Sequence, residues 1–165
     1  YGLRAVVNRC GVIAGPWQMG RVDQGLMALW ISRHVYGGTL SYIGFGGQGK
    51  QVRDMLHVQD LVDLVLLQAS TMDTLKGHTF NVGGGAANSI SLLELTDLCR
   101  SATGNSIEIV ADPKERPADI PYYVTDNKTV SRACGWNPQR NLEAIAEDTA
   151  GWIRDNQDVL RMVLE

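Results

Sequence analysis

Two isolated arginines, Arg53 and Arg116, are the side chains best suited to bind an anion. Arg53 stands in an otherwise apolar stretch, and Arg116 stands in a polar loop at residues 113–121. A guanidinium presents a planar fork of N–H donors, which fits phosphate oxygens better than the point charge of a lysine does. Two such groups that converge on one ligand would form a clamp for a diphosphate.

A structural role for each arginine remains open on the residues alone. Arg53 can pair with Asp54 or Asp60, and structural ion pairs are commoner than ligand sites. Arg116 can be an ordinary solvated loop residue. The spacing therefore leaves two alternatives for Arg53, an internal ion pair or an external anion, and by itself favours the ion pair.

A glycine-rich segment at residues 44–49 matches the Gly-x-Gly-x-x-Gly pattern of dinucleotide-binding loops. Such a loop requires a helix immediately after it, because the helix N-terminus meets the pyrophosphate. Residues 50–56 have an extended pattern instead, and the next helix is expected only from Val58. The segment is therefore interpreted as a turn rather than as a cofactor loop.

Cysteines and histidines predict neither a disulfide framework nor a metal centre. Cys10, Cys99 and Cys134 are widely spaced without a Cys-x-x-Cys pair, and the three histidines lack ligand spacing. Free cysteines are typical of a reducing compartment, so a cytoplasmic location is expected. With a net charge of −3 and only short apolar runs, we expect neither a nucleic-acid partner nor a membrane partner.

The elements that must position these side chains follow from hydrophobic periodicity. Helices are expected at residues 22–35, 58–70, 91–103 and 141–156, with a shorter helix that ends at Cys134. Strands are expected at residues 4–12, 39–43, 51–56, 79–82 and 107–110. Ser91 and Glu94 have capping-box spacing at the start of the third helix. This irregular alternation predicts the α/β class.

Two packing expectations accompany these elements. The strands at 39–43 and 51–56 flank the glycine-rich turn, so they are expected to pair as a hairpin. The helix at 58–70 is apolar on most sides, so it is expected to be buried over much of its surface. The length of 165 residues suits one compact domain or one lobe of a larger one.

Several segments, in order, resemble the extended short-chain dehydrogenase/reductase family of NAD-dependent sugar-nucleotide epimerases and dehydratases. Residues 9–16 resemble its Arg-x-x-Asn-x-Tyr-Gly-Pro segment, and residues 46–61 resemble Gly-x-Gly-x-Gln-x-Arg-Asp-Phe-Val-His-Val-x-Asp-Leu. Residues 80–83, 116–119 and 126–138 follow in family order. The likeness covers nearly the whole chain. Residues 8–25 and 42–47 are most similar to CDP-sugar 2-epimerases of the CDP-paratose (tyvelose) type.

The resemblance implies that residues 1–165 are the C-terminal, substrate-binding portion of such an enzyme. Its fold would be a small mixed α/β lobe plus the last strands and helices of the Rossmann-type domain. NAD would be bound by an N-terminal half that this chain lacks. The family's Tyr-x-x-x-Lys pair is also missing, because no tyrosine here is followed by lysine four positions later. The start at Tyr1, which runs at once into a β-branched stretch, is also interpreted as the sign of a fragment.

The resemblance also implies a site for a nucleotide-diphosphate sugar, either a CDP-sugar or a UDP-sugar. Arg53 and Arg116 would hold the diphosphate. Ser41, Tyr42 and Ile43 would line the base and ribose. Two glutamines would lie near the sugar or the nucleotide, Gln18 and Gln24. The family's Asn and Tyr fall on Val12 and Ala14, so their contacts are not expected here.

The implied reaction is epimerisation through transient oxidation and re-reduction of the sugar. A 4,6-dehydratase, a 4-epimerase and a non-catalytic nucleotide-sugar-binding protein on the same fold are the alternatives. The full-length protein is expected to be a homodimer or a higher homo-oligomer.

Overall fold

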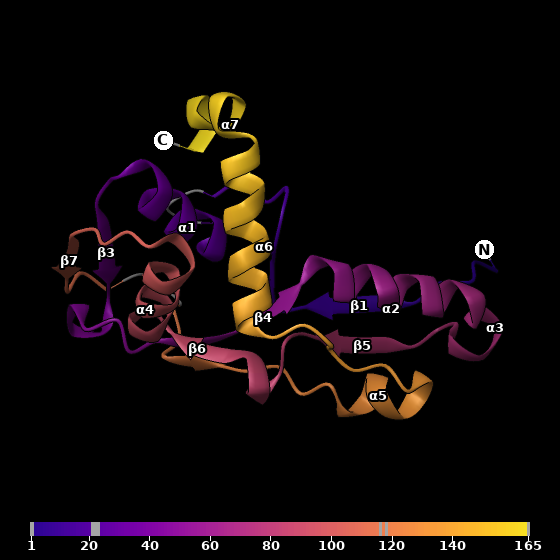
Figure 1. Cartoon of the computed structure of the whole chain (residues 1–165). Coiled ribbons are helices and arrows are strands. Elements are labelled where there is room, and N and C mark those ends of the chain that lie inside the picture. The colour runs from indigo at the N-terminus through magenta and orange to yellow at the C-terminus, as the bar shows by residue number, and fades with distance from the viewer. Residues whose placement is uncertain (1, 21–23, 116, 118, 165) are drawn as a thin grey trace.

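The computed structural model describes residues 2–20, 24–115, 117 and 119–164 of the chain (Figure 1). The helices are α1 (Leu26–Tyr36), α2 (Val58–Ser70), α3 (Met72–Leu75), α4 (Leu92–Thr103), α5 (Lys128–Cys134), α6 (Leu142–Asp155) and α7 (Gln157–Leu164). The strands are β1 (Val7–Cys10), β2 (Val12–Ala14), β3 (Leu40–Ile43), β4 (Val52–His57), β5 (Thr79–Val82), β6 (Ser89–Ser91), β7 (Ile109–Asp112) and β8 (Tyr122–Tyr123). Two 3₁₀ turns complete the set, η1 (Phe45–Gly47) and η2 (Ala86–Asn88). The mixed α/β class expected from the sequence is confirmed.

The molecule is elongated and has two hydrophobic cores (Figure 1). One end, called here the helical lobe, contains α1, α4, α6 and α7 with the β3/β7 pair. The other end, called the β1/β5 lobe, contains that strand pair with α2, α3 and α5. Its core is centred on Phe80 and Trp136.

Strand β4 joins the two lobes because it has partners along its whole length. Its first residues pair with β6 and β8, and its last residues pair in parallel with β2. The other two sheets are short parallel pairs, β1 with β5 and β3 with β7. Arg53 therefore lies in a strand that has neighbours on both sides, which fixes its backbone.

Local signals place several element boundaries where they were expected. Helix α2 has the predicted bounds, and α4 begins at a complete capping box between Ser91 and Glu94. The predicted strand at 4–12 is interrupted at Gly11, where an added Cβ would approach the Thr125 hydroxyl oxygen to 2.8 Å. The helix predicted at 22–35 begins at Leu26 in the described chain, and residues 21–23 lie outside the described residues.

The expected hairpin between residues 39–43 and 51–56 is wrong. Strand β3 pairs with β7, whereas β4 pairs with β2, β6 and β8. Between them, η1 and Gly44 redirect the chain, and Gly44 has a positive φ of 79°. Strand β3 thus pairs with a strand distant in sequence, because any strand with free backbone N–H and C=O groups can complete its edge, not only the nearest one.

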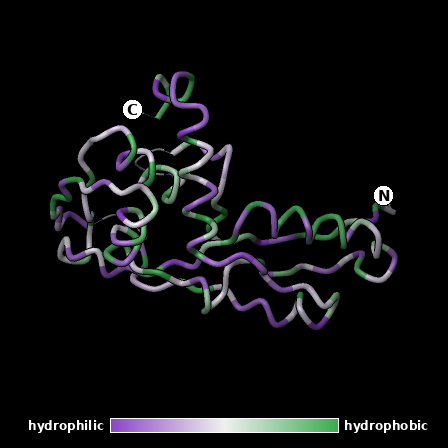
Figure 2. The backbone as a smooth tube through the Cα atoms, in the orientation of Figure 1, coloured by the Kyte–Doolittle hydropathy of each residue, from purple (hydrophilic) through white to green (hydrophobic). Residues whose placement is uncertain are grey.

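The expectation that α2 is buried over much of its surface is also wrong. Leu64 is fully buried against the β1/β5 lobe, but Val62, Val65 and Leu66 are 42%, 48% and 64% exposed. Figure 2 shows hydrophobic residues recurring along this helix. Helix α2 therefore has apolar side chains that the described part of the fold does not cover. Within the described part of the chain, no helix has both the length and the hydropathy needed to cross a bilayer.

Candidate functional site

A cleft of ≈ 400 Å³ lies in the helical lobe, between α1 and the segments that carry β3 and β4. One wall is a single face of α1, because Leu26, Leu29, Trp30 and Arg33 recur at intervals of three and four residues. This volume is within the range of small-ligand sites, and such sites combine an apolar wall with a few polar groups. The cleft is therefore suited in size and lining to hold a ligand.

A second wall comes from β3, where Leu40, Ser41 and Ile43 line the cleft and Tyr42 does not. The Tyr42 hydroxyl lies 2.8 Å from the Thr96 hydroxyl, which also accepts the indole N–H of Trp30 at 3.1 Å. Successive strand residues face opposite sides, so Ser41 and Ile43 can face the cleft while the Tyr42 hydroxyl bonds to Thr96 on α4.

Arg53 reaches the cleft, and an aspartate on the 113–121 loop holds it there. Its Nη2 donates to Asp119 Oδ1 at 2.6 Å, and its Nη1 donates to the Val52 carbonyl at 2.7 Å. The side chains of Arg53 and Asp119 are 18% and 25% exposed, and both line the cleft. The other N–H groups among the five that a guanidinium carries have no partner within the described residues. The Arg53 guanidinium can therefore still donate to an anion.

The predicted ion-pair partners of Arg53, Asp54 and Asp60, are wrong. Asp54 is fully buried and accepts the N–H of Gly85 at 2.9 Å and the Thr125 hydroxyl at 3.2 Å. Because Asp54 follows Arg53 directly in β4, its side chain points to the opposite face of the strand. It fastens β4 to the loop after β5 instead of balancing the arginine.

Arg116 lies outside the described residues, so its convergence with Arg53 stays a prediction. Asp119, three positions further along the same loop, does contact Arg53. The same Asp119 oxygen accepts the N–H of Ile120 at 2.9 Å. This bond fixes the carboxylate within its loop, so the Arg53–Asp119 contact fastens that part of the loop to the cleft.

The two glutamines assigned to the substrate occupy different places. Gln24 lines the cleft beside the start of α1. Gln18 does not line it, and its side-chain N–H donates to the Ile13 carbonyl at 2.6 Å. Gln18 thus supports the loop that follows β2, and Gln24 is the one with access to a ligand.

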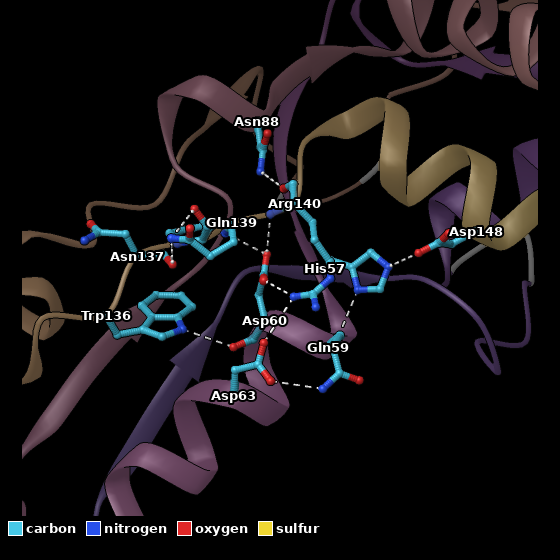
Figure 3. Close-up of polar contacts among 11 residues, drawn as sticks. His57, Gln59, Asp60, Asp63, Asn88, Trp136, Asn137, Gln139, Arg140 and Asp148 are labelled. Atoms are coloured by element: carbon cyan, nitrogen blue, oxygen red, sulfur yellow. Dashed lines mark hydrogen bonds and ion pairs between the residues drawn. The ribbon is translucent and has the colours of Figure 1, made fainter.

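The second half of the 51–60 stretch forms a closed polar network (Figure 3). His57 caps α2, because its Nδ1 accepts the N–H of Gln59 at 3.0 Å, so the ring proton is on Nε2 and faces Asp148 at 3.1 Å. Asp60 accepts the N–H groups of Gln139 and Arg140 at 3.1 and 3.0 Å and pairs with the Arg140 guanidinium.

Neighbouring groups shift the pKa values of two side chains in this network. Burial acts to lower the pKa of Arg140, but its hydrogen bonds and ion pairs with Asp60 and Asp63 outweigh burial and raise it. A hydrogen bond from Gln59, followed by one from Arg140, lowers the pKa of Asp63. Both shifts stabilise charged forms, as expected for a structural cluster.

The glycine-rich segment at residues 44–49 does not form a dinucleotide-binding loop. Residues 44–49 form η1 and lead into β4, so no helix N-terminus follows the glycines as a dinucleotide loop requires. This confirms the interpretation of the segment as a turn. Within the described ranges, no cluster of three or more His, Cys, Asp or Glu could hold a metal ion.

Sequence reasoning missed two parts of the cleft. The face of α1 was assigned no role in binding, because apolar residues at helical spacing predict burial and not what covers them. Gln51 lines the cleft as well, although only its neighbour Arg53 was assigned a role. Its position two residues before Arg53 was the available signal, because such residues share one face of a strand.

Comparison with known proteins gives one family and consistent relatives. Residues 1–83 match the sequence model of the NAD dependent epimerase/dehydratase family. CDP-paratose 2-epimerase of Salmonella typhi is 31% identical over 154 residues, which are 92% of this chain and 45% of that protein. dTDP-glucose 4,6-dehydratase 1 of Escherichia coli strain K12 is 27% identical over 94% of this chain and 42% of its own.

A solved structure with the same arrangement is UDP-glucose 4-epimerase of Thermotoga maritima with UDP-glucose. It superimposes with a TM-score of 0.80 at 28% identity, over 95% of this chain and 48% of that one. The expected resemblance to the Rossmann-type epimerase fold is thereby confirmed. The chain spans a little under half the length of each of these three relatives.

Proposed function

The chain belongs to the NAD dependent epimerase/dehydratase family, and on that basis we propose that it binds the nucleoside diphosphate of a sugar nucleotide. In this proposal the chain supplies the substrate-binding portion of an NAD-dependent epimerase. Cofactor and catalytic residues are supplied by protein outside the chain. Binding at the diphosphate would orient a distant sugar ring, a recognised use of remote binding energy.

The observation that supports this proposal most directly is the position of Arg53. Its guanidinium is held at the cleft by Asp119 and the Val52 carbonyl, with N–H groups left for a ligand. Charge-assisted hydrogen bonds from arginine to phosphate oxygens are among the strongest in proteins. The apolar α1 face opposite can cover a base or a ribose, with Ser41 and Ile43 beside it.

For the reaction, we propose epimerisation of a CDP-sugar at carbon 2 through transient oxidation and re-reduction. The match to CDP-paratose 2-epimerase supports this choice. A 4-epimerase or 4,6-dehydratase acting on a UDP- or dTDP-sugar is the second candidate, which the other two relatives favour. Arg116 is proposed as the second diphosphate ligand.

Titration calorimetry of the full-length protein with CDP, UDP and dTDP tests the proposal. Arg53→Ala is expected to weaken binding by about 1.5–3 kcal/mol, the range for a lost hydrogen bond to a charged group. Arg100→Ala is a matched control, because Arg100 is an exposed arginine paired with Asp97 on α4, away from the cleft lining.

Four outcomes are informative. A preference for CDP over UDP and dTDP supports the first candidate, and the reverse preference supports the second. Unchanged affinity in Arg53→Ala removes this arginine from the site. Absence of binding by all three nucleotides contradicts the proposed function itself.

A further inference from the structure

Gln51 is a buried amide in the cleft wall whose hydrogen bonding is incomplete. The residue is 6% exposed, and its Nε2 donates to the Ile43 carbonyl at 3.0 Å. Its Oε1 is buried and has no hydrogen-bond partner among the described residues. The orientation of the amide is determined, since the Ile43 carbonyl can only accept and must face the N–H side.

A half-satisfied buried amide costs free energy that an apolar side chain of the same length would not cost. The desolvation of an unpaired polar atom is of the order of 1–3 kcal/mol, whereas one neutral hydrogen bond contributes about 1 kcal/mol. Gln51 is therefore poorly explained as a residue that only stabilises the fold. The hydrogen bond to the Ile43 carbonyl therefore points to a role in connecting two parts of the cleft.

That bond joins two cleft walls that no backbone ladder connects. Strand β3 pairs only with β7 within the described chain, and β4 pairs with β2, β6 and β8. Gln51 directly precedes β4, and its own carbonyl accepts the N–H of Leu92 at 3.3 Å. Its backbone is thereby anchored at the start of α4, while its side chain reaches across to the end of β3.

Gln51 is also in register with Arg53. Residues two apart in an extended segment face the same side, and both of these residues line the cleft. Their backbones are separated by one residue, so a side chain that fixes Ile43 to Gln51 also fixes Ile43 relative to Arg53. The distance between the β3 wall, which is proposed to line the base, and Arg53, which is proposed to bind the diphosphate, is thereby fixed.

We propose that Gln51 is a positioning residue, which holds the β3 wall at a fixed distance from Arg53 so that both engage one nucleoside diphosphate together. This inference rests on the proposed function of the cleft. A ligand that spans both parts gains from a site that is already ordered, because no ordering cost then reduces its affinity. A ligand that contacts only the arginine gains nothing from the tie.

The test compares two ligands in a Gln51→Met variant of the full-length protein. Methionine keeps the length of the side chain but has no N–H for Ile43. Calorimetry is expected to show about five- to tenfold weaker binding of CDP and UDP, the loss of about one hydrogen bond's worth of preorganisation. Binding of inorganic pyrophosphate is expected to change by less than about twofold, since it needs only the arginines.

Gln68→Met is the matched control. Gln68 is 4% exposed and exchanges two amide hydrogen bonds with Asn8, at 2.8 and 2.9 Å, in the β1/β5 lobe. The control is expected to lower the melting temperature without changing the affinity for CDP, UDP or pyrophosphate. If Gln51→Met does not fold, Gln51→Asn keeps an amide that is too short to reach Ile43 and gives the same comparison.

The results separate this inference from the proposed function. If the wild type binds CDP or UDP and Gln51→Met binds them equally well, Gln51 does not position the wall, and the proposed function stands. A parallel loss for nucleotide and pyrophosphate also overturns the positioning role, because it indicates general damage to the site. If the wild type binds no nucleotide, both proposals fail.

Discussion

Two arginine–aspartate pairs in this molecule have the same chemistry and different degrees of completion. Arg140 bridges Asp60 and Asp63, and Asp60 also accepts two backbone N–H groups (Figure 3). Arg53 has one carboxylate partner, Asp119, and one backbone carbonyl. The Asp60 carboxylate of the first pair is saturated by protein donors, whereas the second pair lines a cleft that a ligand can enter.

The difference shows how an ion pair can be assigned to structure or to binding. Asp60 has a side chain that is 1% exposed, and every bond it accepts ties α2 to the segment before α6. A buried charge is tolerated only when such partners surround it. The guanidinium groups of Arg53 and Arg140 have two hydrogen-bond partners each, but Arg53 lies in a cleft where a ligand can supply more. The saturation of Asp60 by its own protein and the position of Arg53 in a cleft, more than the presence of an ion pair, separate the two roles.

The largest expected effect is on stability, from Asp60→Ala. Removal of this carboxylate leaves the backbone N–H groups of Gln139 and Arg140 without their acceptor and the Arg140 guanidinium with Asp63 alone, so unfolding should become easier by about 3–5 kcal/mol. Asp119→Ala, which breaks a partly exposed pair, should cost no more than about 1 kcal/mol. Urea denaturation monitored by circular dichroism measures both, and equal losses would abolish the distinction between the pairs.

Lysine substitutions should separate the pairs by affinity. Arg53→Lys keeps the charge but loses the planar fork, so nucleoside diphosphate binding should weaken by about 1–2 kcal/mol. Arg140→Lys should leave the affinity unchanged and lower stability instead, since a strongly hydrated ammonium is less suited than a guanidinium to pair with the buried Asp60. Calorimetry and denaturation on both variants decide this, and a loss of affinity in Arg140→Lys would place the closed network in the binding site.

A smaller effect of opposite sign is expected for Asp119→Asn. The amide oxygen can still accept from Arg53 and from Ile120, but the negative charge beside the proposed diphosphate is gone. Binding should strengthen by about 0.5–1 kcal/mol, the usual scale for a partly exposed charge pair. Weaker binding would show that the charge of Asp119 is needed to hold the guanidinium at the cleft.

The smallest effect concerns pH and the closed network. The lowered pKa of Asp63 means that its charged form contributes stability above the ordinary carboxylate pKa, and that contribution is lost as pH falls through the lowered value. Asp63→Asn should therefore flatten the acid side of the stability profile while leaving the neutral side little changed. Melting temperatures measured between about pH 6 and pH 2 test this, because the lowered value lies below the ordinary aspartate pKa of about 3.9. An unchanged acid limb would mean that Asp63 does not contribute to it.

Local chemistry made part of this structure readable from the sequence. The capping box at Ser91 and the bounds of α2 depend on residues a few positions apart, so their signals are complete in a short segment. The ordered motifs likewise identified the family, and the glycine-rich turn was separated from a cofactor loop by the absence of a following helix. These conclusions needed no knowledge of distant neighbours.

Only the tertiary structure decided which groups meet. Arg53 is paired with Asp119, 66 positions away, and not with the nearby Asp54 or Asp60. Strand β3 pairs with β7, and the Gln51 side chain, just before β4, donates a hydrogen bond to the end of β3. The α1 face became a cleft wall because the fold left space in front of it. Sequence patterns specify which face of an element is apolar or charged, but the group that lies opposite is set by the packing of the whole chain.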